Sequence, residues 1–180
     1  FRYNAYLQHR LFFRNFWVVC LLLVFTFTIY GDKITSQIES GLYRDQIVYT
    51  KQSLYQKIVL TKYKDDLRLF LDGNVQFSSV DEYRYHEPLV HIPMAVCSNA
   101  QRVLLLGAGD GLAVRQLLKY PQIKSIVLVD LDEEVVNLAK NSHEISRLNE
   151  GALTHPKVTI HIEDAFTYLK RSNDLFDLVI

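Results

Sequence analysis

Three aspartates occupy positions in the sequence where a carboxylate could bind a ligand. Asp110 lies within the glycine-rich string GAGDG of residues 107–111, and Asp130 and Asp164 each end an apolar run. Glycines allow the backbone to turn tightly and to approach a ligand closely. An acid about 20 residues beyond such a loop accepts hydrogen bonds from ribose hydroxyls in nucleotide-binding folds. Together the three acids indicate a nucleoside site, and Asp110 suits a ligand that also carries positive charge.

The glycine loop departs from the full dinucleotide fingerprint, because Leu112 takes the place of its third glycine and Asp110 would repel a pyrophosphate. Two other interpretations stay open at this point. The loop could be a strand-to-helix turn that uses glycine for its geometry alone, and each of the three acids could cap a helix. Asp132 fits a helix cap best, with Glu133 and Glu134 complementing the helix dipole behind it.

The spacing of histidines and cysteines does not predict a metal site. His86 and His91 are five residues apart with Pro88 between them, whereas a zinc-binding helix of the zincin type needs a spacing of four. Cys20 and Cys97 form neither a disulfide framework nor a zinc pattern. We therefore expect no bound metal.

Strands alternate with helical runs from Arg102 onward, which would bring the three acids to one edge of a sheet. The apolar strand runs predict a parallel sheet with helices on both faces. The expected fold class is α/β, a Rossmann-like doubly wound sheet of the class I methyltransferase type, truncated after its fourth strand. Its expected strands are residues 102–106, 125–130, 158–164 and 176–180, and its expected helices are residues 112–120, 133–141 and 165–171.

A small antiparallel β-sheet is expected before this domain. Residues 53–77 carry β-branched and aromatic side chains in approximate alternation, with turn residues at Lys64–Asp66 and Asp72–Asn74. The second of these turns, DGN, is a hairpin signal. Residues 81–97 then read as a helix whose regularity two prolines limit.

The N-terminal segment is apolar enough to predict a transmembrane helix. Residues 16–30 contain no charge and form about 22 Å of helix. An extension back to Leu11 reaches about 30 Å, the thickness of a hydrocarbon core, if Arg14 snorkels towards the headgroups. Trp17 and Tyr30 would serve as interface anchors. A buried core helix and a signal peptide are the alternatives, and the second is disfavoured because no small-residue cleavage site follows Tyr30.

Composition and the chain ends bound the remaining possibilities. The 180 residues carry 20 basic and 20 acidic side chains, and a net charge of zero argues against a nucleic-acid-coating protein. A hydrophobic content of 49% argues against disorder. Because the chain starts at Phe1 and ends within an apolar run, we expect a fragment of a longer chain. The expected domains are a transmembrane helix with an amphipathic juxtamembrane segment (residues 1–51), the small sheet (52–80) and the truncated Rossmann-like domain (81–180).

Several motifs together resemble one known family. The chain carries, in order, LDGNVQFSSVDEYRYHEPLVHIP, VLLLGAGDGLAVRQLLKY, VLVDLDEEV and EDAFTYL. This series resembles the polyamine aminopropyltransferases, the spermidine synthase family, over roughly Ser53 to Ile180, and is most similar to its membrane-fused bacterial branch. The strings YQ-x-I, LDG-x-x-Q and DE-x-x-YHE separate the family from generic methyltransferases. Ala108 departs from the usual GGGDG loop, a mild change if that residue keeps a negative φ.

The resemblance implies a role for each matching residue. Asp110 would pair with the ammonium of the donor's aminopropyl tail, and Asp130 would hold the ribose. Asp164 and Ala165 would contact the adenine, while Tyr85 would lie on the acceptor side. The general-base aspartate would follow just past Ile180, so the fragment alone is expected to be inactive. The implied substrate-binding residues are Gln56, Gln76, His86, Gly107, Gly109, Asp110, Gly111, Asp130, Asp164 and Ala165.

The implied reaction moves the aminopropyl group of decarboxylated S-adenosylmethionine to putrescine or a related amine, giving spermidine and methylthioadenosine. The donor is a sulfonium with an ammonium tail and the acceptor is a dication, so Asp81, Glu82 and Glu87 are further candidate carboxylates. Two alternatives stay open. One is an S-adenosylmethionine-dependent methyltransferase, and the other is a non-catalytic protein that binds polyamines or nucleosides.

The resemblance also sets the expected partners and location. We expect no tightly bound cofactor, with decarboxylated S-adenosylmethionine acting as cosubstrate. The expected partners are putrescine or another polyamine and a lipid bilayer, without nucleic acid, and homo-oligomerisation is left open. The expected location is the inner or plasma membrane of a bacterium, with the catalytic domain in the cytoplasm, because the cosubstrate is made there.

Overall fold

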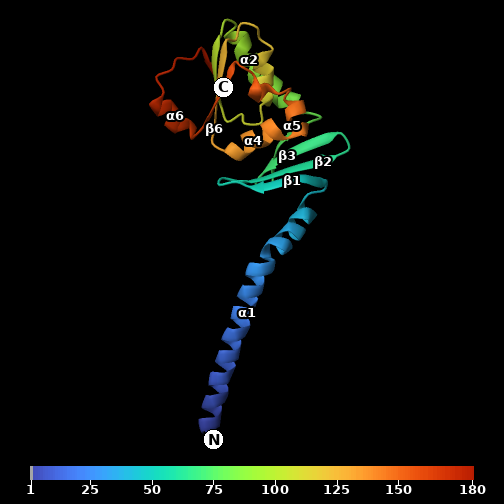
Figure 1. Cartoon of the computed structure of the whole chain (residues 1–180), viewed down its shortest axis with the longest axis vertical. Coiled ribbons are helices and arrows are strands. Elements are labelled where there is room, and N and C mark those ends of the chain that lie inside the picture. Colours follow the sequence, from blue (N-terminus) through green and yellow to red (C-terminus); the bar gives the residue numbers. More distant parts are fainter. Residues whose placement is uncertain (1) are drawn as a thin grey trace. The chain divides into compact units, whose positions relative to one another are not determined.

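A computed structural model describes residues 2–180, with side chains from residue 12 onward except those of residues 32–40 and 42. The chain divides into two compact units, Phe1–Gln46 and Ile47–Ile180 (Figure 1). The first unit consists mainly of the long helix α1. The second unit contains the sheets and the remaining helices.

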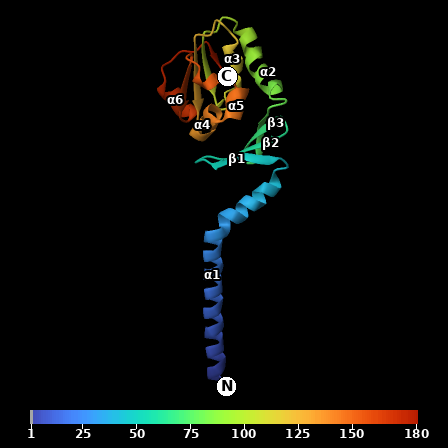
Figure 2. The same cartoon turned by 45° about the vertical axis from the view of Figure 1, so that its right-hand side comes forward.

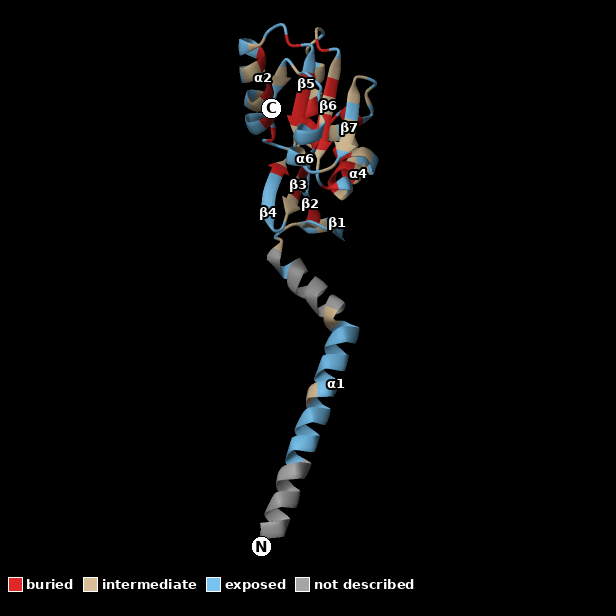
Figure 3. Cartoon of the chain, turned by 90° about the vertical axis from the view of Figure 1, so that its left-hand side faces the viewer, coloured by how far each residue is buried: buried red, intermediate tan, exposed pale blue. Residues whose placement is uncertain are grey.

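Helix α1 spans Arg2–Leu42 as one element. Within it, the 20 residues Phe12–Gly31 are long and apolar enough to cross a membrane, and none of this window is buried among the described residues (Figure 3). Thr26 and Thr28 donate their hydroxyls to backbone carbonyls about one turn earlier, at 2.6 and 2.8 Å, so neither hydroxyl needs water. The expected juxtamembrane helix is continuous with α1, and its apolar face lies outside the described side chains.

An antiparallel sheet with strand order β1-β2-β3-β4 opens the second unit. Its turns place Lys64, Asp72 and Gly73 at positive φ values of 53°, 49° and 78°, a region that glycine and aspartate tolerate better than most residues. The predicted small sheet is therefore confirmed, but the sequence did not indicate its first strand. The strands are β1 (Gln46–Gln52), β2 (Lys57–Tyr63), β3 (Asp66–Leu71) and β4 (Asn74–Ser78).

The second sheet is parallel, with strand order β7-β6-β5-β8, as predicted. Its strands are β5 (Arg102–Leu106), β6 (Ser125–Asp130), β7 (Val158–Ile162) and β8 (Leu178–Val179). The helices of this unit are α2 (Tyr83–Val96), α3 (Leu112–Leu118), α4 (Glu133–Asn141), α5 (His143–Leu148) and α6 (Ala165–Arg171), with a 3₁₀ turn at Ala152–Thr154. Helix α5 and the 3₁₀ turn were not predicted.

Helices cover both faces of the parallel sheet because alternate strand residues point to opposite sides. Val103 and Leu105 of β5 join a core formed with α2, α3 and α4, whereas Leu104 packs with Tyr168 of α6. Figure 2 shows α6 on one side of the sheet and α2 and α3 on the other. Buried residues concentrate in β5 and β6 (Figure 3). The predicted α/β architecture is thereby confirmed.

The two sheets of the second unit share one hydrophobic core. Ile58 of β2 and Phe77 of β4 belong to the same buried cluster as Val90 of α2 and Val103 of β5. A boundary at residues 80 and 81 therefore separates two elements of one packed body. The three expected domains, 1–51, 52–80 and 81–180, stay a prediction.

The strand order reverses beside β5. The chain continues from β5 to β6 and β7 on one side, and β8 is added on the other. The backbone N–H of Leu106 donates to the carbonyl of Ile180 at 2.9 Å, which ties the two strand ends together. In open α/β sheets, ligands bind beyond the carboxyl ends of the strands at such a switch point. The glycine loop of residues 107–111 lies at this position.

Candidate functional site

The glycine loop after β5 leaves room for a carboxylate that packs against it. Gly107 and Gly111 have φ values of 77° and 80°, a region that side chains disfavour. A Cβ atom on Gly109 would lie 2.6 Å from Oδ2 of Asp130, so this position cannot carry a side chain without displacing the acid. Ala108 does not have a positive φ, so its methyl group is compatible with the loop.

Asp130, at the end of β6, is fixed by backbone donors on both of its oxygens. Oδ2 accepts from the N–H of Gly109 at 2.8 Å, and Oδ1 accepts from the N–H of Asp132 at 2.9 Å. Burial raises the pKa of Asp130 and the charges of Asp110 and Asp132 raise it further, against the lowering effect of the two backbone hydrogen bonds. The carboxylate is therefore held rigidly beside the loop.

A cavity of about 460 Å³ opens at the switch point and brings predicted site residues together. Gln76 comes from β4, Tyr85 and His86 come from α2, and Asp110 comes from the glycine loop. Its apolar wall includes Leu105 and Leu106 of β5, Leu89, Ala113 and Ile180. Five residues expected from the sequence, Gln76, Tyr85, His86, Gly107 and Asp110, thus line a single cavity.

His86 is 4% exposed and is fixed from behind by a buried ion pair. Its Nδ1 atom lies 2.9 Å from both the backbone carbonyl and the Oε2 atom of Glu82. The other carboxylate oxygen of Glu82 accepts from Nη2 of Arg115, so both oxygens of this buried acid have protein partners, and its role as a carboxylate for a cationic ligand stays a prediction. Nε2 of His86 lies 3.8 Å from Oδ2 of Asp110.

The electrostatic surroundings favour the protonated form of His86. Burial lowers the pKa of the imidazole, but the carboxylates of Asp110 and Glu82 outweigh burial, and the pKa of His86 is raised above its ordinary value. The separation of 3.8 Å from Asp110 exceeds hydrogen-bond range, so this attraction is Coulombic. Arg115, Glu82, His86 and Asp110 form a row of alternating charge that ends in the cavity.

Gln56 lies outside the cavity at the switch point and contacts Asp132. Its amide donates to Oδ2 of Asp132 at 2.9 Å, and the hydroxyl of Ser53 donates to the same oxygen at 2.6 Å. Asp132 also caps α4 by accepting from the N–H of Glu134, as predicted. Ser53 and Asp132 line a smaller cavity of about 300 Å³, which also reaches Ile162 at the end of β7.

Asp164 and Ala165 stand at the start of α6, on the same sheet edge as Asp130. The N–H of Glu163 donates to the carbonyl of Asp130 at 3.0 Å, which joins the ends of β7 and β6. Oδ1 of Asp164 accepts from the N–H and hydroxyl of Thr167, and these bonds lower the pKa of Asp164. Asp164 is therefore a helix cap in this structure, and its place in a ligand site stays a prediction.

Asn149 supports the glycine loop although no motif marked it. It is buried after α5, and its Nδ2 atom donates to the carbonyl of Asp110 at 2.9 Å and to that of Ala139 at 3.2 Å. A Cβ atom on Gly111 would lie 2.9 Å from the same Nδ2 atom. The only sequence signal was an asparagine beside apolar positions, which is too common to predict such a contact.

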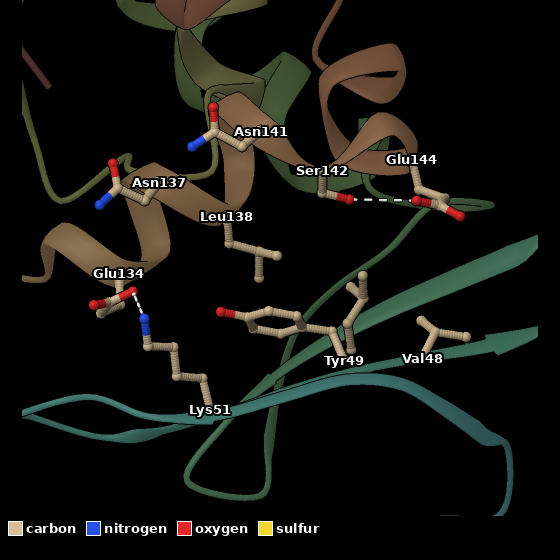
Figure 4. A pocket seen from close by; sticks show the side chains of 10 residues that line it. Val48, Tyr49, Lys51, Glu134, Asn137, Leu138, Asn141, Ser142 and Glu144 are labelled. Atoms are coloured by element: carbon tan, nitrogen blue, oxygen red, sulfur yellow. Dashed lines mark hydrogen bonds and ion pairs between the residues drawn. The ribbon is translucent and has the colours of Figure 1, made fainter.

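A second cavity, of about 600 Å³, lies between the antiparallel sheet and α4 (Figure 4). Lys51 of β1 and Glu134 of α4 face each other across it, with Nζ and Oε2 2.6 Å apart. The hydrogen bond and charge of Glu134 raise the pKa of Lys51. Tyr49, Asn137 and Asn141 supply further polar groups, and none of the residues expected from the sequence to bind substrate lines this cavity.

Comparison with known proteins identifies related sequences. Residues 82–180, more than half of the chain, match the spermine/spermidine synthase domain. The chain is 47% identical over 163 residues to a polyamine aminopropyltransferase of Leptospira interrogans, covering 91% of this chain and 32% of that protein. It is 44% identical over 151 residues to a polyamine aminopropyltransferase of Oceanobacillus iheyensis, covering 84% and 30%. The chain thus spans about a third of the length of these curated relatives.

Solved structures share the fold of the second unit. The chain is similar to the spermidine synthase from Thermotoga maritima with a TM-score of 0.70 and 29% identity, covering 75% of this chain and 47% of that one. A spermidine synthase in complex with the transition-state analogue AdoDATO matches with the same TM-score and identity, covering 75% and 45%.

Proposed function

Because the chain belongs to the spermine/spermidine synthase domain family, we propose that the protein transfers the aminopropyl group of decarboxylated S-adenosylmethionine to putrescine or a related amine. The products are spermidine and methylthioadenosine. The observation that carries this proposal is the cavity at the switch point, where Asp110 and His86 meet Gln76 and Tyr85. A carboxylate in a half-apolar cavity at this position suits the ammonium tail of the donor.

The transfer is a substitution at the carbon next to the sulfonium. The lone pair of an unprotonated amine forms the new C–N bond while the C–S bond breaks, and the electrons of the broken bond stay on sulfur, which becomes a neutral thioether. The amine then gives up one proton to a base. Because the reaction makes one bond, breaks one bond and moves one proton, most of the barrier reduction would come from placing the amine in line with the C–S bond.

The residues of the second unit receive the following roles in this proposal. Asp110 holds the ammonium of the donor, and Asp130 accepts hydrogen bonds from the ribose hydroxyls. Gln56 orders Asp132 beside the nucleoside, which fits its hydrogen bond in this structure. Tyr85, which is exposed at the cavity mouth, lies on the acceptor side. The other residues proposed to bind substrate are Gln76, His86, Asp164, Ala165 and the glycines at 107, 109 and 111.

An assay of the full-length protein tests this function directly. With decarboxylated S-adenosylmethionine and putrescine we expect equimolar methylthioadenosine and spermidine. Formation of S-adenosylhomocysteine from S-adenosylmethionine would instead establish the methyltransferase alternative. Binding of either nucleoside without any product, across a panel of di- and polyamines, would establish the non-catalytic alternative.

The apolar window Phe12–Gly31 is proposed to span a lipid bilayer, with the second unit on the cytoplasmic side of a bacterial inner or plasma membrane. Its 20 residues correspond to about 30 Å of helix, the thickness of a hydrocarbon core. Exposed aromatic and aliphatic side chains along the window support this proposal. We expect the protein to sediment with membranes and to resist extraction at high pH, and protease added to spheroplasts should leave residues 47–180 intact. Recovery in the soluble fraction would refute the span.

A further inference from the structure

The orientation of the His86 ring is determined by atoms that can only accept hydrogen bonds. Nδ1 lies 2.9 Å from the carbonyl of Glu82 and 2.9 Å from its Oε2 atom. Nη2 of Arg115 donates to the other oxygen of the same carboxylate, and Arg115 is itself anchored by a bond from Nη1 to the carbonyl of Leu148 at 2.6 Å. Nδ1 must therefore carry a hydrogen in every state of the site. Protonation and deprotonation can occur only at Nε2.

The Nε2 atom belongs to the cavity that Asp110 lines. Its distance of 3.8 Å from Oδ2 of Asp110 is too long for a direct hydrogen bond. A ligand nitrogen that binds Asp110 would therefore come within reach of Nε2 as well. An ammonium group has only donors, so it can bond to Nε2 only when that atom offers its lone pair.

We propose that the row Arg115–Glu82–His86 acts as a positioning device that presents Nε2 of His86 as an acceptor, so that an ammonium bound at Asp110 displaces a proton from Nε2 to solvent. Before binding, at a pH below the pKa of His86, an imidazolium faces the Asp110 carboxylate. After binding, the imidazole is neutral and the ammonium donates one N–H to Asp110 and one to Nε2. The net charge of the site is the same in both states, which allows a cation to enter a buried site without leaving an unpaired charge. This inference rests on the proposed function, because it takes the donor's aminopropyl tail as the cation.

Other charged groups surround His86 but do not replace Asp110 on the Nε2 side. Glu82 is the N-cap residue of α2 and Tyr85 belongs to that helix, while α3 contributes Arg115 and the glycine loop contributes Asp110. The neighbouring cavity on the side of β3 and β4 adds Arg68, which pairs with Asp66, together with Asp81 and Arg84 at the start of α2. Asp110 is the carboxylate that faces Nε2, at 3.8 Å.

The test compares decarboxylated S-adenosylmethionine with two ligands: methylthioadenosine, which lacks both the aminopropyl ammonium and the sulfonium charge, and the dimethylsulfonium form of methylthioadenosine, which lacks the ammonium alone and should behave like methylthioadenosine. The three ligands are titrated into the full-length protein by calorimetry from pH 6 to pH 9, in phosphate and in Tris. We expect decarboxylated S-adenosylmethionine to release about one proton more than methylthioadenosine at pH 6 and an equal number at pH 9. Proton exchange at Asp130 would affect both ligands equally and cancels in the comparison.

The affinities report the same exchange. Because only the fraction of protein with neutral His86 accepts the ammonium, the affinity for decarboxylated S-adenosylmethionine should rise about tenfold per pH unit below the pKa of His86 and level off above it. The affinity for methylthioadenosine should stay flat. Equal proton release by the two ligands, or parallel pH profiles, overturns the inference while leaving the proposed function intact. If neither ligand binds, the proposed function and the inference both fail.

A matched pair of variants separates positioning from general charge effects. Glu82→Gln removes the buried carboxylate behind His86, and Glu134→Gln makes the same chemical change at the exposed ion pair with Lys51. We expect Glu82→Gln to move the proton release to lower pH and Glu134→Gln to leave it unchanged. Identical behaviour of the two variants would count against the row. If Glu82→Gln does not fold, the comparison of ligands in the unaltered protein still tests the proton exchange at His86.

Discussion

Two cavities of the second unit hold charged groups in opposite circumstances. At the switch point, the side chains of Arg115, Glu82 and His86 are at most 11% exposed. Between the antiparallel sheet and α4, the Lys51 and Glu134 side chains are 47% and 31% exposed. Water and salt screen the second pair, whereas burial strengthens every interaction in the first row. A short ion-pair distance is therefore weak evidence for a functional site, and burial with convergent partners is the reason for placing the proposed site at the switch point.

Asp110→Asn, in the cavity at the switch point, should cause the largest change in ligand affinity of the series. The variant keeps an acceptor for the N–H of Leu112, which Oδ1 of Asp110 binds at 2.9 Å, but it removes the charge. Because hydrogen bonds to charged groups are worth about 1.5–3 kcal/mol, affinity for decarboxylated S-adenosylmethionine should fall by about 10- to 100-fold. Calorimetry should show an unchanged affinity for methylthioadenosine, and Asp174→Asn at an exposed pair should change neither. Equal losses for both ligands would refute the assigned role.

Gly109→Ala should displace Asp130, the acid proposed to bind the ribose. The added Cβ atom would lie 2.6 Å from Oδ2 and 2.9 Å from Cγ of Asp130, so the carboxylate must move. We expect a loss of about 1–3 kcal/mol in the free energy of unfolding from overpacking, and weaker binding of methylthioadenosine. Urea unfolding and calorimetry measure the two effects. Ala108→Gly is the control, and a similar loss of nucleoside affinity there would mean that Asp130 is not the cause.

The buried row should also make stability depend on pH. Burial lowers the pKa of His86, but Asp110 and Glu82 raise it more, so around neutral pH the folded state binds more protons than the unfolded state. This contribution is fully present below pH about 6.5 and is lost as the pH rises through the folded-state pKa. The free energy of unfolding should therefore fall with rising pH in this window. His86→Gln should flatten that slope, and His143→Gln, at an exposed histidine, should not.

Lys51→Ala should have the smallest effect of the series. Exposed ion pairs contribute little to stability, because solvent screens the charges and ordering two long side chains costs entropy. We expect the melting temperature and the affinity for both nucleosides to match those of the unaltered protein. A clear loss of nucleoside affinity would mean that the cavity in Figure 4 is part of the ligand site. The buried row and the exposed Lys51–Glu134 pair would then no longer differ in function.

Much of the fold could be predicted because its signals are local. The apolar runs at residues 102–106 and 125–130 and the glycine turn between them predict strand, loop and helix in order, and the structure confirms each. Strand β1 escaped prediction because residues 46–52 contain no fully buried side chain, and its sequence, QIVYTKQ, lies in a polar stretch. Its strand character depends on pairing with the neighbouring strand β2, and the context of the sheet decides such a half-exposed strand more than its own residues do.

The candidate site was predictable where one loop or one helix supplies the residues. Asp110 stands within a motif, and Tyr85 and His86 are adjacent in the chain. The inward orientation of Glu82 was not predictable, because it depends on Arg115, 33 residues away on another helix. The same holds for Gln56, whose partner Asp132 is 76 residues away. Residue type predicted that Glu82 and Gln56 have polar partners, and the tertiary packing alone determines which partner each of them has.

Asn149 connects the glycine loop and helix α4 through a single side chain. One amide group bonds to the glycine loop through Asp110 and to α4 through Ala139. The loop cannot open without breaking a bond at the end of a packed helix, so its amide protons should exchange with solvent as slowly as those of the core. Binding then needs little ordering of the loop, and the free energy of binding is not spent on closing it. The glycines of this loop therefore determine its conformation without making it flexible.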